Sequence, residues 1–124
     1  MLVGLIKDQV RHQDLLGYSK LNAEERIEYI RELSLGLNIE LVEFLQEMPW
    51  KPWRKIEDQH SDPVSAADEL GDVFIFLLNL WIQLLQTEHE DLSAHDIAFK
   101  IFEVVGKKQN INLGRLAVGY NQKR

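Results

Sequence analysis

Two pairs of acidic residues in this chain have a spacing that suits a metal ion. Glu40 and Glu43 form the first pair, and Glu69 and Asp72 form the second. In each pair the second acid follows the first at position i+3. Residues at this spacing lie on the same side of an α-helix, so each pair should project two carboxylates from one helical face. The neighbouring positions are mostly apolar, and acids on an apolar helix need either basic partners or a cation. Carboxylate clusters of this kind suit hard divalent cations, and Mg²⁺ is the first candidate.

The acid pairs also have an interpretation without metal. A single pair of this spacing is common on solvated helix faces, and Glu69, with Asp68 beside it, could lie near a helix N-terminus, where the helix dipole favours acids. The presence of two pairs strengthens the metal hypothesis. The 25 residues between Glu43 and Glu69 leave room for a turn and an antiparallel return, which would bring four carboxylates together.

Apolar residues recur at helical spacing along most of the chain, which predicts an all-α fold of four main helices without strands. Asn22, three residues before Glu25, predicts a capping box at the start of the second helix. Gly17 and Gly106 are expected to end the first and fourth helices. Gly36 lies inside the second helix and predicts either a close helix crossing or a break. The expected helices cover residues 2–16, 23–48, 64–87 and 94–105.

The segment between the acid pairs is expected to be a loop with aromatic and cationic side chains. Two prolines within residues 49–52 prevent the second helix from continuing. Trp50 and Trp53 offer flat faces that could stack on a base, and Lys51 and Arg54 could pair with phosphate. The alternative is that both tryptophans anchor the core and both cations are solvated.

Two further polar segments have open interpretations. Gln9, His12 and Gln13 form a polar row on the first helix, which either presents amides to the edge of a base or simply faces solvent. Residues 107–124 are basic and contain no acid. Such a segment is either a flap that closes over phosphates or a disordered C-terminus.

Length and composition predict one domain, residues 1–124, in the ordinary size range of a single hydrophobic core. The net charge of −6 argues against nucleic-acid binding and against an anionic membrane surface. The absence of cysteine excludes disulfides and fits a cytoplasmic protein. The apolar run 73–85 is too short for a membrane span, which takes about 20 residues, and exceeds one helix face, so we expect it to lie in a homodimer interface.

Taken in chain order, these motifs resemble the all-α nucleoside triphosphate pyrophosphohydrolases. They are most similar to the dimeric dUTPases, with the MazG-type enzymes as cousins. The resemblance spans residues 9–120 and rests on the two acid pairs, the Trp-Lys loop and a C-terminal pattern made of Lys108, Asn112, Arg115, Gly119 and Tyr120. It implies a dimerising bundle of four to five helices.

The resemblance also implies roles for individual residues. The Mg²⁺ ligands, which could equally hold Mn²⁺, would be Glu40, Glu43, Glu69 and Asp72. The general base would be Glu40 or Glu43. The nucleotide base would meet Gln9, Gln13 and Trp50. The phosphates would meet Lys51 and the C-terminal residues Lys108, Asn112, Arg115 and Tyr120, in part from a second subunit.

The expected activity is hydrolysis of a nucleoside triphosphate to the monophosphate and pyrophosphate, with dUTP as the first candidate substrate. Gln13 stands where the dimeric dUTPases tend to have Asn, and Phe74–Phe76 occupies the place of a common His, so the base preference stays open. One alternative is a MazG-type enzyme that removes modified or other deoxynucleotides. Another is a non-catalytic, dimeric helical module that binds nucleotides. A homodimer or a dimer of dimers is expected, without nucleic-acid or membrane partners.

Overall fold

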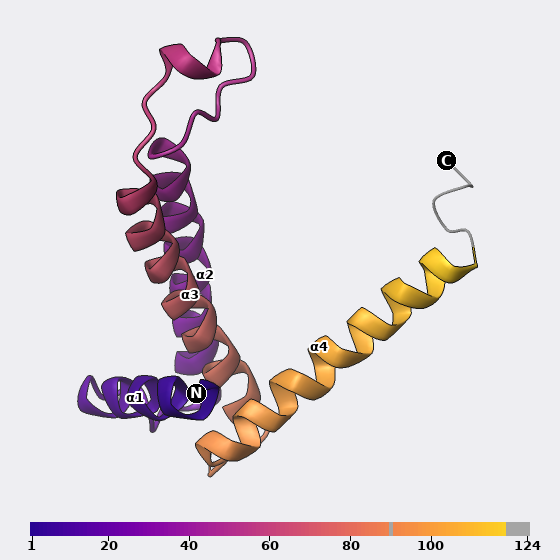
Figure 1. The fold of residues 1–124 in the computed structure, drawn as a ribbon. Helices are drawn as coiled ribbons and strands as arrows, with labels where there is room; N and C mark the ends of the chain where they lie inside the picture. Colours follow the sequence, from indigo (N-terminus) through magenta and orange to yellow (C-terminus); the bar gives the residue numbers. More distant parts are fainter. Residues whose placement is uncertain (90, 119–124) are drawn as a thin grey trace.

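Four α-helices make up most of the molecule (Figure 1), and the computed structural model describes residues 1–89 and 91–118. A short 3₁₀ turn, η1 (Ile56–Asp58), lies in the loop between the second and third helices. The all-α class is confirmed, and there is no strand within the described residues. None of the described helices is both long enough and apolar enough to span a bilayer. The helices are α1 (Leu2–Leu15), α2 (Ala23–Gln46), α3 (Pro63–Gln86) and α4 (Ala94–Ala117).

The helix ends follow local chemistry that the sequence predicted. Asn22 caps α2 in a capping box, because its side chain accepts a hydrogen bond from the Glu25 backbone and the Glu25 carboxylate accepts one from Asn22. Gly17 follows α1 with a φ of 84°, a left-handed conformation that glycine adopts without steric cost. The Tyr18 amide then donates back to the Gln13 carbonyl at 2.8 Å and closes the helix end.

α2 and α3 form a long antiparallel hairpin, and Gly36 lets them approach closely (Figure 1). A Cβ at Gly36 would overlap the ring of Phe76 on α3. The glycine therefore marks a close helix crossing, which was one of its two predicted roles. α2 continues through it without a break.

The buried core lies at one end of this hairpin, where α1 and the first half of α4 pack against α3. The side chains that fill it are aliphatic: Ile6, Leu78, Ile82, Ile97, Ala98 and Ile101. The carboxylate pairs lie toward the other end of the hairpin, near its connecting loop. The aliphatic core and the carboxylate pairs thus lie at opposite ends of the hairpin.

The prediction that α4 ends at Gly106 was wrong, because α4 continues to Ala117. A glycine inside a helix costs only about 1 kcal/mol relative to alanine, and Lys107, Lys108 and Gln109 then favour helix continuation. The basic segment 107–124 is therefore helical as far as Ala117, and residues 119–124 lie outside the described part. Residues 107–117 are all exposed, and Figure 1 shows this half of α4 leading away from the hairpin.

Candidate active site

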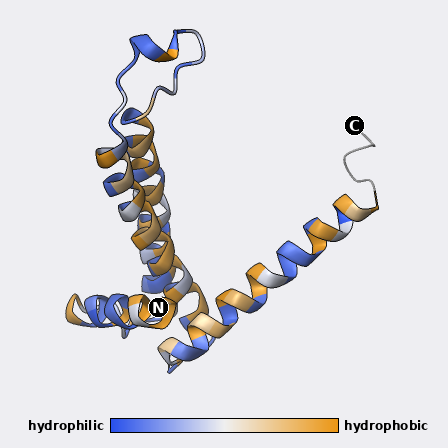
Figure 2. Cartoon of the chain, viewed as in Figure 1, coloured by the Kyte–Doolittle hydropathy of each residue, from blue (hydrophilic) through white to orange (hydrophobic). Residues whose placement is uncertain are grey.

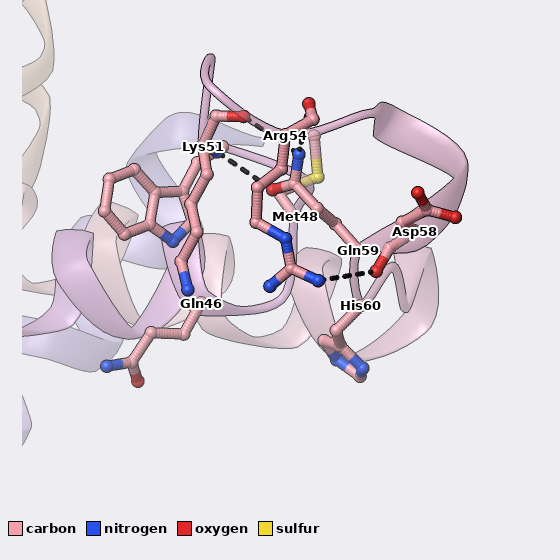
Figure 3. Close-up of a pocket in the computed structure, with 8 residues that line it drawn as sticks. Gln46, Met48, Lys51, Arg54, Asp58, Gln59 and His60 are labelled. Carbon is pink, nitrogen blue, oxygen red and sulfur yellow. Dashed lines mark hydrogen bonds between the residues drawn. The ribbon is translucent and has the colours of Figure 1, made fainter.

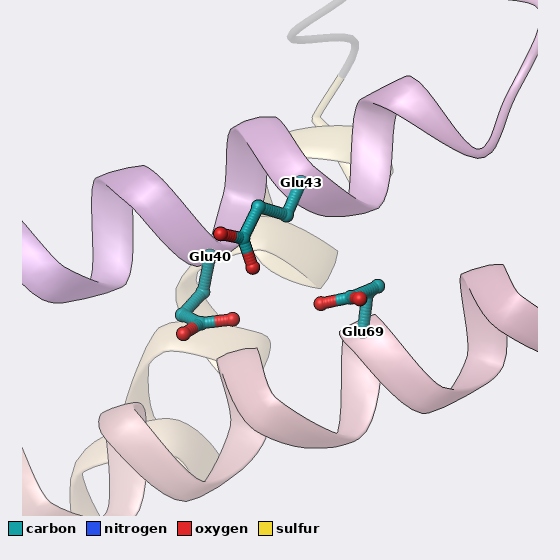
Figure 4. Close-up of side chains that lie close together, drawn as sticks. All are labelled: Glu40, Glu43 and Glu69. Carbon is teal, nitrogen blue, oxygen red and sulfur yellow. The ribbon is translucent and has the colours of Figure 1, made fainter.

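Three carboxylates converge between α2 and α3 (Figure 4). Glu40 and Glu43 reach the site from α2 and Glu69 reaches it from α3, with one ligand atom of each within 4.8 Å of the others. The antiparallel return of the chain is what brings them together, since Glu69 is far from the other two in sequence. Their spacing on each helix places the side chains on the faces that meet, as predicted.

The surroundings of these carboxylates favour a cation. Burial raises the pKa of Glu40, and the adjacent Glu43, Asp72 and Glu69 carboxylates raise it further. Burial likewise raises the pKa of Glu69, together with the charges of Glu43, Asp72 and Glu47. Removing the repulsion between these carboxylates requires either protons or a metal ion.

One oxygen of the cluster is left without a partner. Glu40 Oε2 is a buried atom that accepts no hydrogen bond from any of the described residues. An all-oxygen set of carboxylates with an unsatisfied acceptor is the donor set that Mg²⁺ or Mn²⁺ prefers. The residues present therefore fit a hard divalent cation.

Asp72, the fourth predicted ligand, lies outside the group of three. Its side chain is exposed and is not within the 4.8 Å set, although its charge acts on both Glu40 and Glu69. The structure thus gathers three of the four predicted metal ligands. The role of Asp72 stays a prediction.

Glu47 continues the acid row on α2 but has its own partner. Its Oε2 lies 2.9 Å from His60 Nε2, across the connecting loop. This hydrogen bond is the main reason that the pKa of His60 is raised, with the negative charges of Glu47 and Asp62 adding to it. The pair links the end of the carboxylate row to the loop.

The loop after α2 surrounds a pocket of about 340 Å³ (Figure 3). Its shape depends on Gln59, whose amide binds the backbone of the opposite side of the loop. Gln59 Oε1 accepts from the Lys51 amide at 2.9 Å, and its Nε2 donates to the Lys51 carbonyl at 2.9 Å and to the Arg54 carbonyl at 3.1 Å. The Gln59 side chain therefore holds residues 51–54 in place through hydrogen bonds to their backbone.

The two loop tryptophans are surface residues. Trp50 is 46% exposed and Trp53 is 69% exposed, and their rings meet edge to face with centroids 5.7 Å apart. The alternative in which both tryptophans anchor the core is therefore wrong. Lys51 Nζ lies 5.9 Å from the centre of the Trp50 ring, within the range of a cation–π interaction. An aromatic face and an amine thus lie together at the pocket.

Gln13 is buried, in contrast to the alternative in which the polar row faces solvent. Its Oε1 accepts from Gln83 Nε2 at 2.8 Å, and Gln83 Oε1 accepts from Arg26 at 2.8 Å. Because arginine can only donate, Gln83 Oε1 must be the acceptor and its amide must donate to Gln13. The orientation of the Gln13 amide is therefore set, and its Nε2 is a buried donor without a partner.

The hydrogen-bonded series Arg26–Gln83–Gln13, here called the relay, lies far from the carboxylates of the same chain. Gln83 is 14 residues beyond Glu69 on α3, which corresponds to about 21 Å along the helix axis. Gln9 lies one turn before Gln13 on α1, and its Oε1 is also buried without a hydrogen-bond partner. A single chain therefore does not place Gln9 and Gln13 beside the predicted metal ligands, whereas Trp50 lies in the loop next to them.

The predicted phosphate-binding residues of the C-terminal segment are also remote. Lys108, Asn112 and Arg115 lie on the exposed outer half of α4, and α4 as a whole packs on α1 and α3 but not on α2 within the described residues. Tyr120 lies outside the described residues. Among the described residues predicted to meet phosphate, Lys51 and Arg54 lie in the hairpin loop near the carboxylates, and the three on α4 do not.

Several residues at the site were not singled out by the sequence. Nothing in the sequence distinguishes Gln59 and His60 from other loop residues. In the structure Gln59 holds the loop backbone, and His60 binds Glu47. Gln83 lies in an apolar run, and a lone amide at such a position was a signal that it has a buried partner. The partner could not be named, because it lies 70 residues away.

The fold and site define an all-α protein with a carboxylate cluster suited to a divalent cation between two antiparallel helices. A family model described as dUTPase matches residues 5–120, nearly the whole chain. The chain belongs to this all-α, dUTPase-like family of nucleotide hydrolases. No curated protein and no solved structure matches it significantly.

Proposed function

We propose that this protein is a Mg²⁺-dependent pyrophosphohydrolase that converts a nucleoside triphosphate and water to the monophosphate and pyrophosphate. The observation that carries the proposal is the convergence of Glu40, Glu43 and Glu69, with an unpartnered Glu40 oxygen, in a member of the dUTPase-like family. The proposed first substrate is dUTP.

The carboxylates Glu40, Glu43 and Glu69 would hold Mg²⁺, with Asp72 in support, and Mn²⁺ is expected to substitute. Bound there, the cation supplies positive charge that offsets the repulsion between these acids and a triphosphate. Glu40 or Glu43 accepts a proton from the attacking water as the oxygen of that water bonds to the α-phosphorus. The bond from that phosphorus to the bridging oxygen breaks, and pyrophosphate leaves.

Trp50 and Lys51 complete the part of the proposed site that one chain provides. The half-exposed Trp50 face can stack on a base, and Lys51 supplies a charge for phosphate. Gln9, Gln13 and the outer half of α4 would act from a second chain, because their own chain holds them away from its carboxylates. The proposed site is thus assembled between two subunits.

The orientation of Gln13 supports a keto base. Its amide oxygen already accepts a hydrogen bond from Gln83, whereas its buried NH₂ group has no partner among the described residues, so a ligand gains most by offering that group a carbonyl oxygen. Uracil and thymine present such an oxygen where cytosine has an amino group. A site that hydrogen-bonds one edge rejects a mismatched edge strongly.

A panel of five deoxynucleoside triphosphates tests the proposal directly. Pyrophosphate release from dUTP, dTTP, dCTP, dATP and dGTP is measured with Mg²⁺, with Mn²⁺ and with a chelator. We expect release that depends on the cation and is fastest with dUTP. Glu43→Gln and Glu69→Gln should each reduce kcat at least about a hundredfold while circular dichroism stays helical.

Other outcomes of the panel favour other functions. A preference for a purine, or an unchanged ranking in Gln13→Ala, would show that α1 does not bind the base and would favour a MazG-type role. No release from any nucleotide, together with measurable nucleotide binding, would favour the non-catalytic module. Near-normal turnover in both glutamine variants would refute the role of the carboxylate cluster.

A further inference from the structure

The pocket in the α2–α3 loop is lined by two lysine or arginine side chains and one acid, within a protein of net charge −6. Lys51, Arg54 and His60 line it, and Asp58 is the one acid among its lining residues. Figure 3 shows the Lys51 amine and the Arg54 guanidinium extending to the same side of the loop, with Gln46 and His60 beyond them.

The cations of the pocket are only weakly engaged within the described part of the chain. Arg54 makes one hydrogen bond, from its terminal nitrogen to the Asp58 carbonyl at 3.4 Å, which is long for a guanidinium. Lys51 Nζ lies over the Trp50 ring and pairs with no carboxylate of the described residues. His60 uses Nε2 for Glu47, which leaves Nδ1 for another partner. Most of the donors of this pocket are therefore available to a ligand.

The pocket begins where the carboxylate cluster ends. Gln46, which lines it, lies three residues after Glu43 on α2, or about 4.5 Å along the axis. Glu47, which binds His60, is close enough to Glu69 that its charge raises the pKa of that acid. An anion in the pocket would therefore lie directly beside whatever the three carboxylates hold.

We propose that Arg54 and His60, together with Lys51, form a subsite for the two terminal phosphates of the substrate, which leave as pyrophosphate. This inference rests on the proposed function and adds Arg54 and His60 to the binding residues. The planar guanidinium suits bidentate binding of phosphate oxygens, and the loop that carries it is held by Gln59 before any ligand arrives. Trp50 then forms the aromatic wall of the same pocket.

Inorganic pyrophosphate is the probe that tests the subsite without the reaction. Its binding to the full-length protein is measured by calorimetry in the presence of a chelator, so that no metal bridges it to the carboxylates. We expect Arg54→Gln to weaken pyrophosphate binding about tenfold or more, as for the loss of one charge-assisted interaction. Arg54→Lys should restore part of the loss, because it keeps the charge without the fork.

Lys55→Gln is the matched control, since it removes one charge from the next residue of the same loop, which does not line the pocket. It should leave pyrophosphate binding within about twofold of the unaltered protein. Deoxyuridine, a nucleoside without phosphate, is the second probe, and its binding should not change in Arg54→Gln. His60→Asn should weaken pyrophosphate binding less than Arg54→Gln, because it removes one donor that Glu47 already shares.

Three results would overturn the subsite. Unchanged pyrophosphate binding in Arg54→Gln would remove its basis, and an equal loss in Lys55→Gln would reduce it to a general field of the loop. A loss of deoxyuridine binding in Arg54→Gln, with pyrophosphate unaffected, would make the pocket a nucleoside site instead. If no nucleotide is hydrolysed but pyrophosphate binding depends on Arg54 as expected, the proposed function fails and the anion subsite stands.

Discussion

The surroundings of Glu40 disfavour its free carboxylate and favour a bound cation. One of its oxygens is buried without a hydrogen-bond partner, and its neighbours are other carboxylates. The folded protein therefore holds like charges close together, which favours protonation or metal binding over the free carboxylates. The same feature that destabilises the metal-free site provides its affinity for a cation.

The raised pKa values of Glu40 and Glu69 predict a pH dependence of stability. Between the unfolded glutamate pKa of about 4.3 and the raised folded value, the folded state binds more protons than the unfolded state, so stability decreases as the pH rises. In urea titrations with a chelator, we expect the unfolding midpoint of the protein to increase as the pH falls from about 7 to about 5.

The double variant Glu40→Gln/Glu69→Gln is the control for this effect. It should unfold at a higher urea concentration near pH 7 and show a flatter dependence on pH, since the repelling charges are gone. The raised pKa of His60, caused mainly by its hydrogen bond to Glu47, is common to both proteins and cancels in the comparison. Identical slopes for the two proteins would contradict the assignment of the pH dependence to these carboxylates.

The Arg26–Gln83–Gln13 relay predicts an order of stabilities. Gln83→Leu removes one acceptor of the buried Arg26 and the donor to Gln13, and should cost about 1–3 kcal/mol in the free energy of unfolding. Gln13→Leu should cost less, because Gln83 Nε2 keeps the Tyr18 carbonyl at 3.3 Å. Chemical denaturation measures both values, and a larger loss for Gln13→Leu would show that the relay is not centred on Gln83.

At the scale of the elements, the α2–α3 hairpin has a close contact at Gly36 that a residue with a Cβ would block. The Phe76 ring occupies the space beside the Gly36 backbone, so the two helices can approach more closely there than at any alanine. The carboxylates lie one turn further along α2, at Glu40. The glycine thus helps to set the helix separation at which Glu69 reaches the other two acids.

Two glycine substitutions should have opposite effects on stability. Gly36→Ala forces the Phe76 ring to move, and overpacking of this kind costs about 1–3 kcal/mol, more than the gain in helix propensity. Gly106→Ala has no atom within 4 Å of the new Cβ and should stabilise α4 by up to about 1 kcal/mol. Thermal unfolding checks both, and a stabilising Gly36→Ala would argue against the close crossing.

At the scale of the whole molecule, much apolar surface is left uncovered. Side chains at alternating spacings of four and three form a stripe along α3: Leu70, Phe74, Leu77, Trp81 and Leu84. Such spacing is typical of a helix that packs against another helix along its length. Figure 2 shows that α4 also has hydrophobic residues along its outer half, where residues 107–117 are exposed in the described chain. An isolated helix of that kind is marginal in water.

We therefore predict a homodimer that covers the α3 stripe. Leu77 lies at its centre and lines an apolar pocket of about 280 Å³ with Leu80 and Trp81. Leu77→Lys should shift the protein to the monomer in sedimentation velocity at micromolar concentration, because a charge would be buried in an apolar interface. Activity should fall with it if the site is shared between subunits.

Val64→Lys is the control for the dimer prediction. It adds the same charge to an exposed position of α3 outside the stripe and should leave the sedimentation coefficient unchanged. A protein that sediments as a folded monomer before any substitution would refute the dimer. A dimer that persists in Leu77→Lys would place the interface elsewhere, with the outer half of α4 as the remaining candidate.

The sequence by itself determined the parts of this protein that depend on neighbours along the chain. Helix positions followed from the spacing of apolar residues, and the start of α2 followed from Asn22. The carboxylate pairs could be found because three-residue spacing fixes a common helix face. The end of α4 could not be predicted from Gly106, since a glycine ends a helix only where the backbone turns left-handed, as it does at Gly17 and not at Gly106.

Only the tertiary structure decided which distant side chains meet. Gln9 and Gln13 could read either edge of a base when only their sequence was known. The contact of Gln13 with Gln83, and of Gln83 with Arg26, then set one amide orientation. The pairing of Glu47 with His60 and the support of the loop by Gln59 were equally invisible. Periodicity fixes the face on which a side chain lies, but its partner depends on how the helices pack, and that is a property of the whole chain.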